Sequence, residues 1–273
     1  MQEAAIEHVP ASDASLPVPR LVRTRDGERH ARWRSTAGVE HVVRALTYLP
    51  GTKLDARDIS LDALHRYGAL AARMGVALRG FEHPAAHHAL LWDNKQAAGV
   101  RPLLRYVEDP ARRPVVDRWL TRIEAETLPA MAMLRAQVIH NDLTRDNVLF
   151  DQNQSVSAVL DFGDMVHTAL VCDLANLLAA LLGERPDFLA VAEAAIRGYD
   201  SVTRLEDAEL LLLADVVATR AVADIVVSEW RKERHPENAE YITHWKAGSW
   251  VILDTLEEMG MEEATGRFRD FVR

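Results

Sequence analysis

Four polar residues with suitable side chains and spacing could together carry out phosphoryl transfer. Asp142 follows His140 by two positions, Asn147 lies five positions further on, and Asp161 ends a second apolar run just before Phe162-Gly163. Phosphoryl transfer requires little covalent work from a protein, but it needs an acceptor for the hydroxyl proton and compensation of phosphate charge. Asp142 can accept the proton, while Asn147 and Asp161 offer the amide and carboxylate oxygens that Mg²⁺ prefers.

The residues around this group have more ordinary interpretations as well. Taken singly, Asp142 and Asn147 would be read as turn-forming or capping residues, and only their combination with Asp-Phe-Gly favours a catalytic loop. His140 is expected to support the turn by hydrogen bonding. Asp164 is expected either to bind a substrate amine or to cap the next segment. Asp173 is expected to be an N-cap or a partner of the catalytic-loop backbone.

The elements that must position these residues form a short β-rich segment, a long helical portion and a small β island. Apolar runs bounded by turn signals predict strands at 20–24, 29–34, 41–49, 137–140, 148–150 and 157–160. Helical spacing predicts helices at 61–78, with Asp58 and Ser60 as candidate caps, and at 112–134, with a kink near Pro129. From Val171 onward the chain is predicted to be helix after helix.

One charged pair lies on a helix that is otherwise apolar. Arg220 and Asp224 are four residues apart, which is typical of an ion pair on a helix surface. The alternative is that the pair faces the cleft, because the flanking residues are nearly all hydrophobic.

Composition excludes several classes of protein. The net charge is -9 and no Lys/Arg-rich run occurs, which argues against a nucleic-acid partner and fits either a cationic small substrate or plain solubility. The single cysteine, Cys172, cannot form an internal disulfide, which fits a reducing cytoplasm. The most apolar stretch, 210–227, carries Asp215, Arg220 and Asp224, so no membrane partner is expected. The sequence does not indicate an oligomeric state.

The motif of His140, Asp142 and Asn147, followed by Asp161 and Asp164 around Phe-Gly, resembles the aminoglycoside phosphotransferase and choline kinase family. Proteins of this family have the protein-kinase-like fold. The resemblance implies that Asp142 is the catalytic base and that Asn147 and Asp161 hold Mg²⁺.

Further segments resemble the hydroxylysine kinase branch of that family, namely those at 43–51, 81–84, 92–93 and 163–167. The implied fold class is α+β. Residues 1–51 would be an incomplete, small β-rich N-lobe that ends in a hinge. Residues 52–273 would be a large, mainly helical C-lobe that carries the catalytic β island.

The resemblance also implies a nucleotide site and a substrate class. The adenine of ATP would meet the backbone of the hinge at Thr47, Tyr48 and Leu49. The activity would be phosphate transfer to a hydroxyl of an amino-bearing metabolite such as 5-hydroxylysine, in the cytoplasm. The alternatives are a kinase-like binding protein without turnover, and an aminoglycoside kinase.

Two parts of a kinase nucleotide site have no counterpart in the sequence. No Gly-x-Gly-x-x-Gly occurs, and all four lysines follow the hinge, at Lys53, Lys95, Lys232 and Lys246. Glu3 or Glu7 would be the partner of the absent lysine. These features predict an N-terminally truncated member of the family with weak or absent ATP binding.

Overall fold

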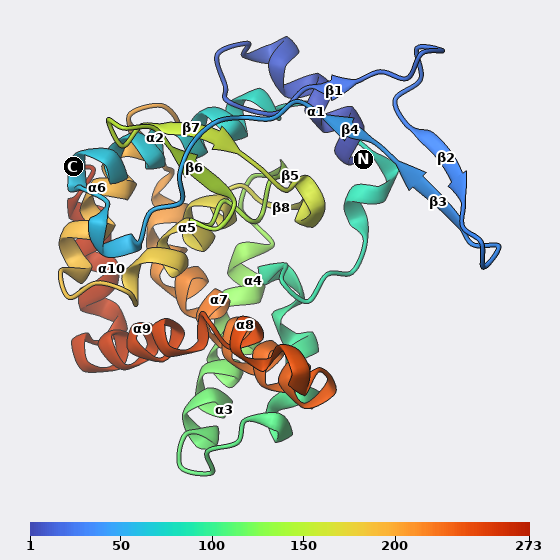
Figure 1. The fold of residues 1–273 in the computed structure, drawn as a ribbon. Coiled ribbons are helices and arrows are strands. Elements are labelled where there is room, and N and C mark those ends of the chain that lie inside the picture. Colours follow the sequence, from blue (N-terminus) through green and yellow to red (C-terminus); the bar gives the residue numbers. More distant parts are fainter.

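Ten α-helices and four two-stranded antiparallel sheets make up the computed structural model, which describes residues 1–273 (Figure 1). The helices are α1 Gln2–Ser12, α2 Leu61–Ala77, α3 Arg113–Arg122, α4 Leu128–Met131, α5 Cys172–Leu182, α6 Phe188–Asp200, α7 Asp207–Arg234, α8 Ala239–Ile242, α9 Lys246–Met259 and α10 Met261–Asp270. The strands are β1 Leu21–Val22, β2 Ala31–Arg34, β3 Glu40–Val43, β4 Ala45–Leu46, β5 Ala136–Ile139, β6 Val148–Phe150, β7 Val156–Val159 and β8 Val166–Ala169. The predicted α+β class is confirmed.

The N-terminal segment forms two strand pairs, and only Leu21 of β1 packs against the helical core. The β2–β3 hairpin projects away from it in Figure 1, and all eight of its residues are exposed. The prediction of one strand at 41–49 is wrong, because the chain changes partner at Arg44: β3 pairs with β2, whereas β4 pairs with β1. Helix α1, in contrast, buries Ala5, Ile6 and Val9 in the same core as the helices after residue 52. The lobe boundary at residue 51 therefore stays a prediction.

Helices α2 and α6 pack closely because each presents a glycine to the other. A Cβ on Gly68 of α2 would lie 2.1 Å from the carbonyl oxygen of Ala195, and one on Gly198 of α6 would lie 1.9 Å from that of His65. Helix α2 begins where predicted, since the Ser60 hydroxyl accepts the Ala63 N–H at 3.2 Å. This packing fixes the position of α2, whose Tyr67 hydroxyl donates a hydrogen bond to the catalytic loop at the Leu143 carbonyl oxygen.

The β island frames the catalytic loop. Strands β5 and β8 pair antiparallel, with Ile139 opposite Val166, and β6 pairs with β7, with Val148 opposite Val159. The loop leaves β5 at His140 and enters β6, while Asp161 follows β7. Strand β8 was missed by the sequence analysis, which expected no strand after residue 160.

The predicted helix at 112–134 is divided into three parts. Helix α3 ends at Arg122, a π-helical turn spans Ile123–Thr127, and the short helix α4 follows. Pro129 cannot donate a backbone hydrogen bond and its ring crowds the preceding turn, so the wider π turn relieves the conflict. None of the helices combines the length and the apolar composition needed to cross a bilayer.

Candidate active site

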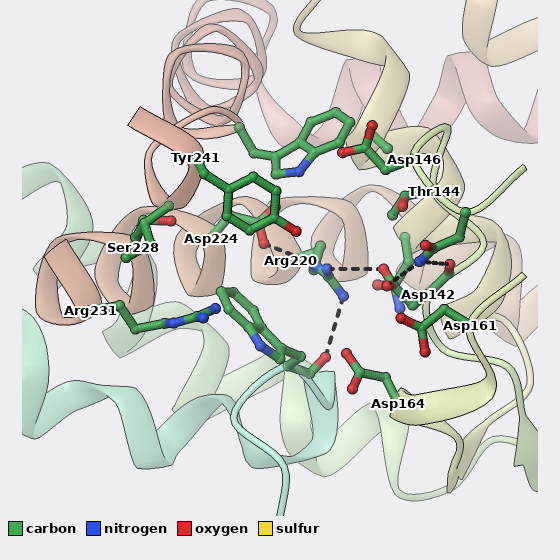
Figure 2. Close-up of a pocket in the computed structure, with 16 residues that line it drawn as sticks. Asp142, Thr144, Asp146, Asp161, Asp164, Arg220, Asp224, Ser228, Arg231 and Tyr241 are labelled. Carbon is green, nitrogen blue, oxygen red and sulfur yellow. Dashed lines mark hydrogen bonds and ion pairs between the residues drawn. The ribbon is translucent and has the colours of Figure 1, made fainter. Parts of the chain in front are cut away.

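A cavity of about 320 Å³ opens between the β island and helices α7 and α8 (Figure 2). It is walled by the catalytic loop, the segment after β7, one face of α7 and the short helix α8. Its lining is Trp92, Asp142, Thr144, Asp146, Asn147, Asp161, Asp164, Asn176, Ala180, Arg220, Asp224, Ser228, Arg231, Tyr241, Ile242 and Trp245. The structure therefore brings together the predicted base, both predicted metal ligands and the predicted substrate residue.

Within the catalytic loop, Asp142 and Asn147 contact each other directly. The Asn147 Nδ2 donates to the Asp142 carbonyl at 3.1 Å and to Asp142 Oδ2, which leaves the amide oxygen of Asn147 without a protein partner. His140 is buried and lies beneath this pair. Its Nε2 is 3.1 Å from the carbonyl oxygen of Leu160, and its Nδ1 accepts the Asp142 N–H at 3.3 Å. Burial lowers the pKa of His140, so the ring is neutral, as this pair of contacts requires.

Asp173 stabilises the backbone at the start of the catalytic loop through hydrogen bonds. Its two carboxylate oxygens accept the backbone N–H groups of Asn141, at 2.7 Å, and His140, at 3.2 Å. Asn141 has a left-handed backbone, with φ 66°, which an Asn tolerates better than most residues. Asn176 adds a second brace, because its Nδ2 donates to the carbonyl oxygen of Asn141 at 2.8 Å. Loop geometry is thus set by buried polar side chains of α5.

Asp161 sits in a tight turn after β7. Its φ is 53°, and its Oδ1 accepts the Gly163 N–H at 3.0 Å, which leaves Oδ2 free to meet a ligand. A Cβ on residue 163 would lie 2.8 Å from Asp161 Oδ1, so a side chain there would displace the Asp161 carboxylate from its present position. Asp164 lines the same cavity and makes no hydrogen bond or ion pair within the protein. Partial burial, followed by the charge of Asp142, raises the pKa of Asp164.

The Arg220–Asp224 pair faces the cavity, and its interpretation as a helix-surface pair is wrong. Arg220 Nε donates to Asp224 Oδ1 at 3.0 Å, and Arg220 Nη2 lies 3.8 Å from Asp142 Oδ1 (Figure 2). Burial alone would lower the pKa of Arg220, but the carboxylates of Asp224 and Asp142 raise it. Because α7 is buried around most of its circumference, a charged pair at this position cannot lie on the solvent-exposed surface of the protein. The guanidinium instead lies between the carboxylates of Asp224 and Asp142 inside the cavity.

The predicted hinge lies away from this cavity, at the end of β4. The Thr47 N–H donates to the carbonyl oxygen of Arg20 at 2.9 Å, and the Tyr48 side chain is 85% exposed. The backbone N–H groups of Tyr48 and Leu49 make no hydrogen bond in the structure. They are therefore open to a ligand.

Asn176, Ser228 and Arg231 escaped the sequence analysis, whereas a cleft-facing position of Arg220 and Asp224 was one of its two alternatives. Asn176 is a lone amide in the apolar run of α5, and Arg220, Asp224, Ser228 and Arg231 recur at helical spacing on α7. A row of polar residues on an otherwise apolar helix can line a water-filled cleft as readily as it can face the outer surface of the protein. Tyr67 is different, since its hydroxyl donates to the carbonyl oxygen of Leu143 at 2.9 Å through a tertiary contact that no local pattern predicts.

The free oxygens of Asn147 and Asp161 fit a magnesium ion. Mg²⁺ is commonly held by one or two protein oxygens, with water and phosphate oxygens completing the octahedron. No group of three or more His, Cys, Asp or Glu side chains in the structure is placed to hold a metal ion without such help. The donor set therefore suits Mg²⁺ bound together with a nucleotide.

Comparisons with known proteins place the chain among phosphotransferases. The chain is 28% identical to hydroxylysine kinase from Mus musculus over 241 residues, which cover 84% of this chain and 64% of that protein. It is 32% identical to homoserine kinase from Gluconobacter oxydans over 186 residues, which cover 64% and 55%. An amicoumacin kinase, solved in complex with AMP-PNP, Ca²⁺ and Ami, has a similar fold, with a TM-score of 0.67 at 17% identity over 93% of this chain and 76% of that one.

The first of these relatives is thus matched over slightly less than two thirds of its own length. The resemblance stated from the catalytic motif is confirmed by a family model. The model described as "Phosphotransferase enzyme family" matches residues 2–210. The chain therefore belongs to the phosphotransferase enzyme family.

Proposed function

We propose that the chain transfers the γ-phosphoryl group of ATP to a hydroxyl of a small amino-bearing metabolite of the hydroxylysine type. The observation that carries this proposal is that Asp142, Asn147 and Asp161 line one cavity together with an unpaired carboxylate, Asp164. The hydroxylysine kinases and the homoserine kinase to which the chain is similar support a hydroxyl acceptor that also carries an amine.

Asp142 would act as the base. Its carboxylate accepts the hydroxyl proton of the acceptor as the oxygen attacks phosphorus, and the Arg220 guanidinium lies 3.8 Å from that carboxylate. Asn147 holds Asp142 in place through two hydrogen bonds from one amide nitrogen. The acceptor hydroxyl is thereby oriented by groups fixed before it binds.

The nucleotide would occupy the side of the cavity next to Asn147 and Asp161. Mg²⁺ held by these two residues would offset the charge of the phosphates. The free backbone N–H groups of Tyr48 and Leu49 are suited to donate hydrogen bonds to the ring nitrogens of the adenine. Asp164 is placed for an acceptor ammonium, because it faces the cavity and has no partner in the protein.

The direct test is Asp142→Asn, assayed by transfer of labelled phosphate from ATP to 5-hydroxylysine in the presence of Mg²⁺. Loss of a general base is expected to lower kcat by about 10²- to 10⁴-fold. Asp270→Asn is the matched control, since it makes the same chemical change at an exposed position on α10. Transfer by the Asp142 variant at the rate of the control would refute the assignment.

A further inference from the structure

Four polar side chains form a stripe along one face of the apolar helix α7. Arg220, Asp224, Ser228 and Arg231 are spaced by four, four and three residues, which places them on one side of a helix of 3.6 residues per turn. All four line the cavity, and Figure 2 shows the Arg231 side chain reaching into it. Arg220 and Arg231 lie about 16 Å apart along the helix axis, so they serve opposite ends of the cavity.

Arg231 differs from the other cations near the end of α7 in having no partner. Lys232 pairs with Glu108 at 2.6 Å, and Arg234 stacks on the Trp230 ring at 4.7 Å. Arg231 makes no hydrogen bond or ion pair through its side chain and is half-buried against the cavity. Basic residues are common in the last turn of a helix, where they complement the helix dipole. That preference does not account for one of them being turned into a cavity.

Two further hydrogen-bond donors, Ser228 and Tyr241, line the cavity together with Arg231. Ser228 is 3% exposed, yet its hydroxyl makes no hydrogen bond within the protein. Tyr241 of α8 also lines the cavity, and Figure 2 shows its phenol ring on the same side as Ser228 and Arg231. This end of the cavity therefore offers a cation and two hydroxyls.

The other end of the cavity has the opposite character. Asp142, Asp161 and Asp164 gather there, and Arg220 between the two ends is already engaged by Asp142 and Asp224. Arg231 is thus the one cation of the lining that remains without a carboxylate. A cavity polarised in this way matches a molecule with a hydroxyl and an ammonium at one end and an anion at the other.

We propose that Arg231 binds the carboxylate of the acceptor, with Ser228 and Tyr241 as additional donors. The acceptor is then a hydroxy amino acid, which excludes simple amino alcohols and aminoglycosides as good substrates. This inference rests on the proposed function, because it concerns the same cavity. A guanidinium suits the role, since it can meet both carboxylate oxygens at once.

The experiment compares two acceptors that differ only in the carboxylate, 5-hydroxylysine and 1,5-diamino-2-hydroxypentane. Binding is measured by isothermal titration calorimetry on the full chain, and KM and kcat are measured by phosphate transfer. Arg231→Ala is expected to weaken hydroxylysine binding and raise its KM about 10- to 100-fold, as for loss of a charge-assisted hydrogen bond, with kcat little changed. The compound without a carboxylate should bind the unaltered protein weakly and be insensitive to Arg231→Ala.

Two further variants sharpen the result. Arg231→Lys keeps the charge but loses the two-pronged geometry, so its KM should fall between those of the unaltered protein and the alanine variant. Arg234→Ala is the matched control, because it removes an arginine one turn away that does not line the cavity.

The outcomes separate this inference from the proposed function. Equal binding of both acceptors, no measurable binding of hydroxylysine, or a KM unchanged in Arg231→Ala would overturn the role of Arg231. Hydroxylysine binding that depends on Arg231 without any phosphate transfer would retain that role and refute the proposed function. Transfer to both acceptors at equal rates would retain the proposed function and refute the role of Arg231.

Discussion

At the scale of single residues, the catalytic loop depends on a carboxylate that is sealed from water. Asp173 is 1% exposed and accepts two backbone N–H groups, from His140 and Asn141. Burial raises the pKa of Asp173 to about 7, although both hydrogen bonds act in the opposite direction. The residue that fixes the loop is therefore also one whose charged form is disfavoured by burial in the folded state.

This arrangement predicts a pH-dependent difference between the protein and Asp173→Asn. Between about pH 4 and pH 7 the folded state binds a proton at Asp173 that the unfolded state has released, so this contribution to stability is lost as pH rises through that window. Asparagine does not titrate. The stability advantage of the unaltered protein over the variant should therefore shrink by about 1 to 3 kcal/mol between pH 5 and pH 8. Urea unfolding at both pH values measures it, and a pH-independent difference would contradict the prediction.

The residues that sequence reasoning found are those whose chemistry is encoded locally. Asp142, Asn147 and Asp161 sit in a short motif, and the structure places all three on one cavity. For Arg220 the sequence left a surface position and a cleft position open, and Arg231 was missed, because whether a helix face meets solvent or a cleft depends on what packs beside it. The spacing of polar residues in a sequence shows that they share one face of a helix, but it does not show what packs against that face.

At the scale of elements, the position of the loop depends on how α2 and α6 meet. Gly68 and Gly198 allow the two backbones to approach, and Tyr67, next to Gly68, donates its hydroxyl to the carbonyl oxygen of Leu143. Neither glycine stood out in the sequence, since a glycine inside a helical pattern has several meanings. Strand β8 was missed for a similar reason: its four residues carry little signal alone, and they form a strand because β5 is there to pair with them.

The glycine contact yields a prediction with an internal control. Gly198→Ala would place a Cβ against the backbone of α2, so we expect it to lower the free energy of unfolding by about 1 to 3 kcal/mol despite the better helix propensity of alanine. Gly266→Ala makes the same change within α10, where nothing lies within 4 Å, and it should raise the free energy of unfolding by about 0.5 to 1 kcal/mol. Urea denaturation of both variants provides the measurement. Similar effects in the two would show that the close approach of α2 and α6 does not limit stability.

At the scale of the whole molecule, stability is expected to be uneven between two sheets of the same size. The β2–β3 and β5–β8 pairs each have four antiparallel residue pairs. All residues of β2 and β3 are exposed, including Trp33 at 56% and Val42 at 60%. Strand β8, in contrast, buries Val166, Thr168 and Ala169. Their backbone ladders are alike, so burial is the main difference between them.

Native-state hydrogen exchange should therefore separate the two sheets. A two-stranded hairpin without a covered face is at best marginally stable, so we expect the amides of β2 and β3 to exchange through local opening that needs far less free energy than global unfolding. The amides of β5 and β8 should instead open only with the helical core, because their side chains are packed against it. Exchange followed by mass spectrometry of peptides from 30–44 and 134–171 would measure both. Protection of β2–β3 equal to that of β5–β8 would contradict the prediction and would mean that another surface covers the hairpin in solution.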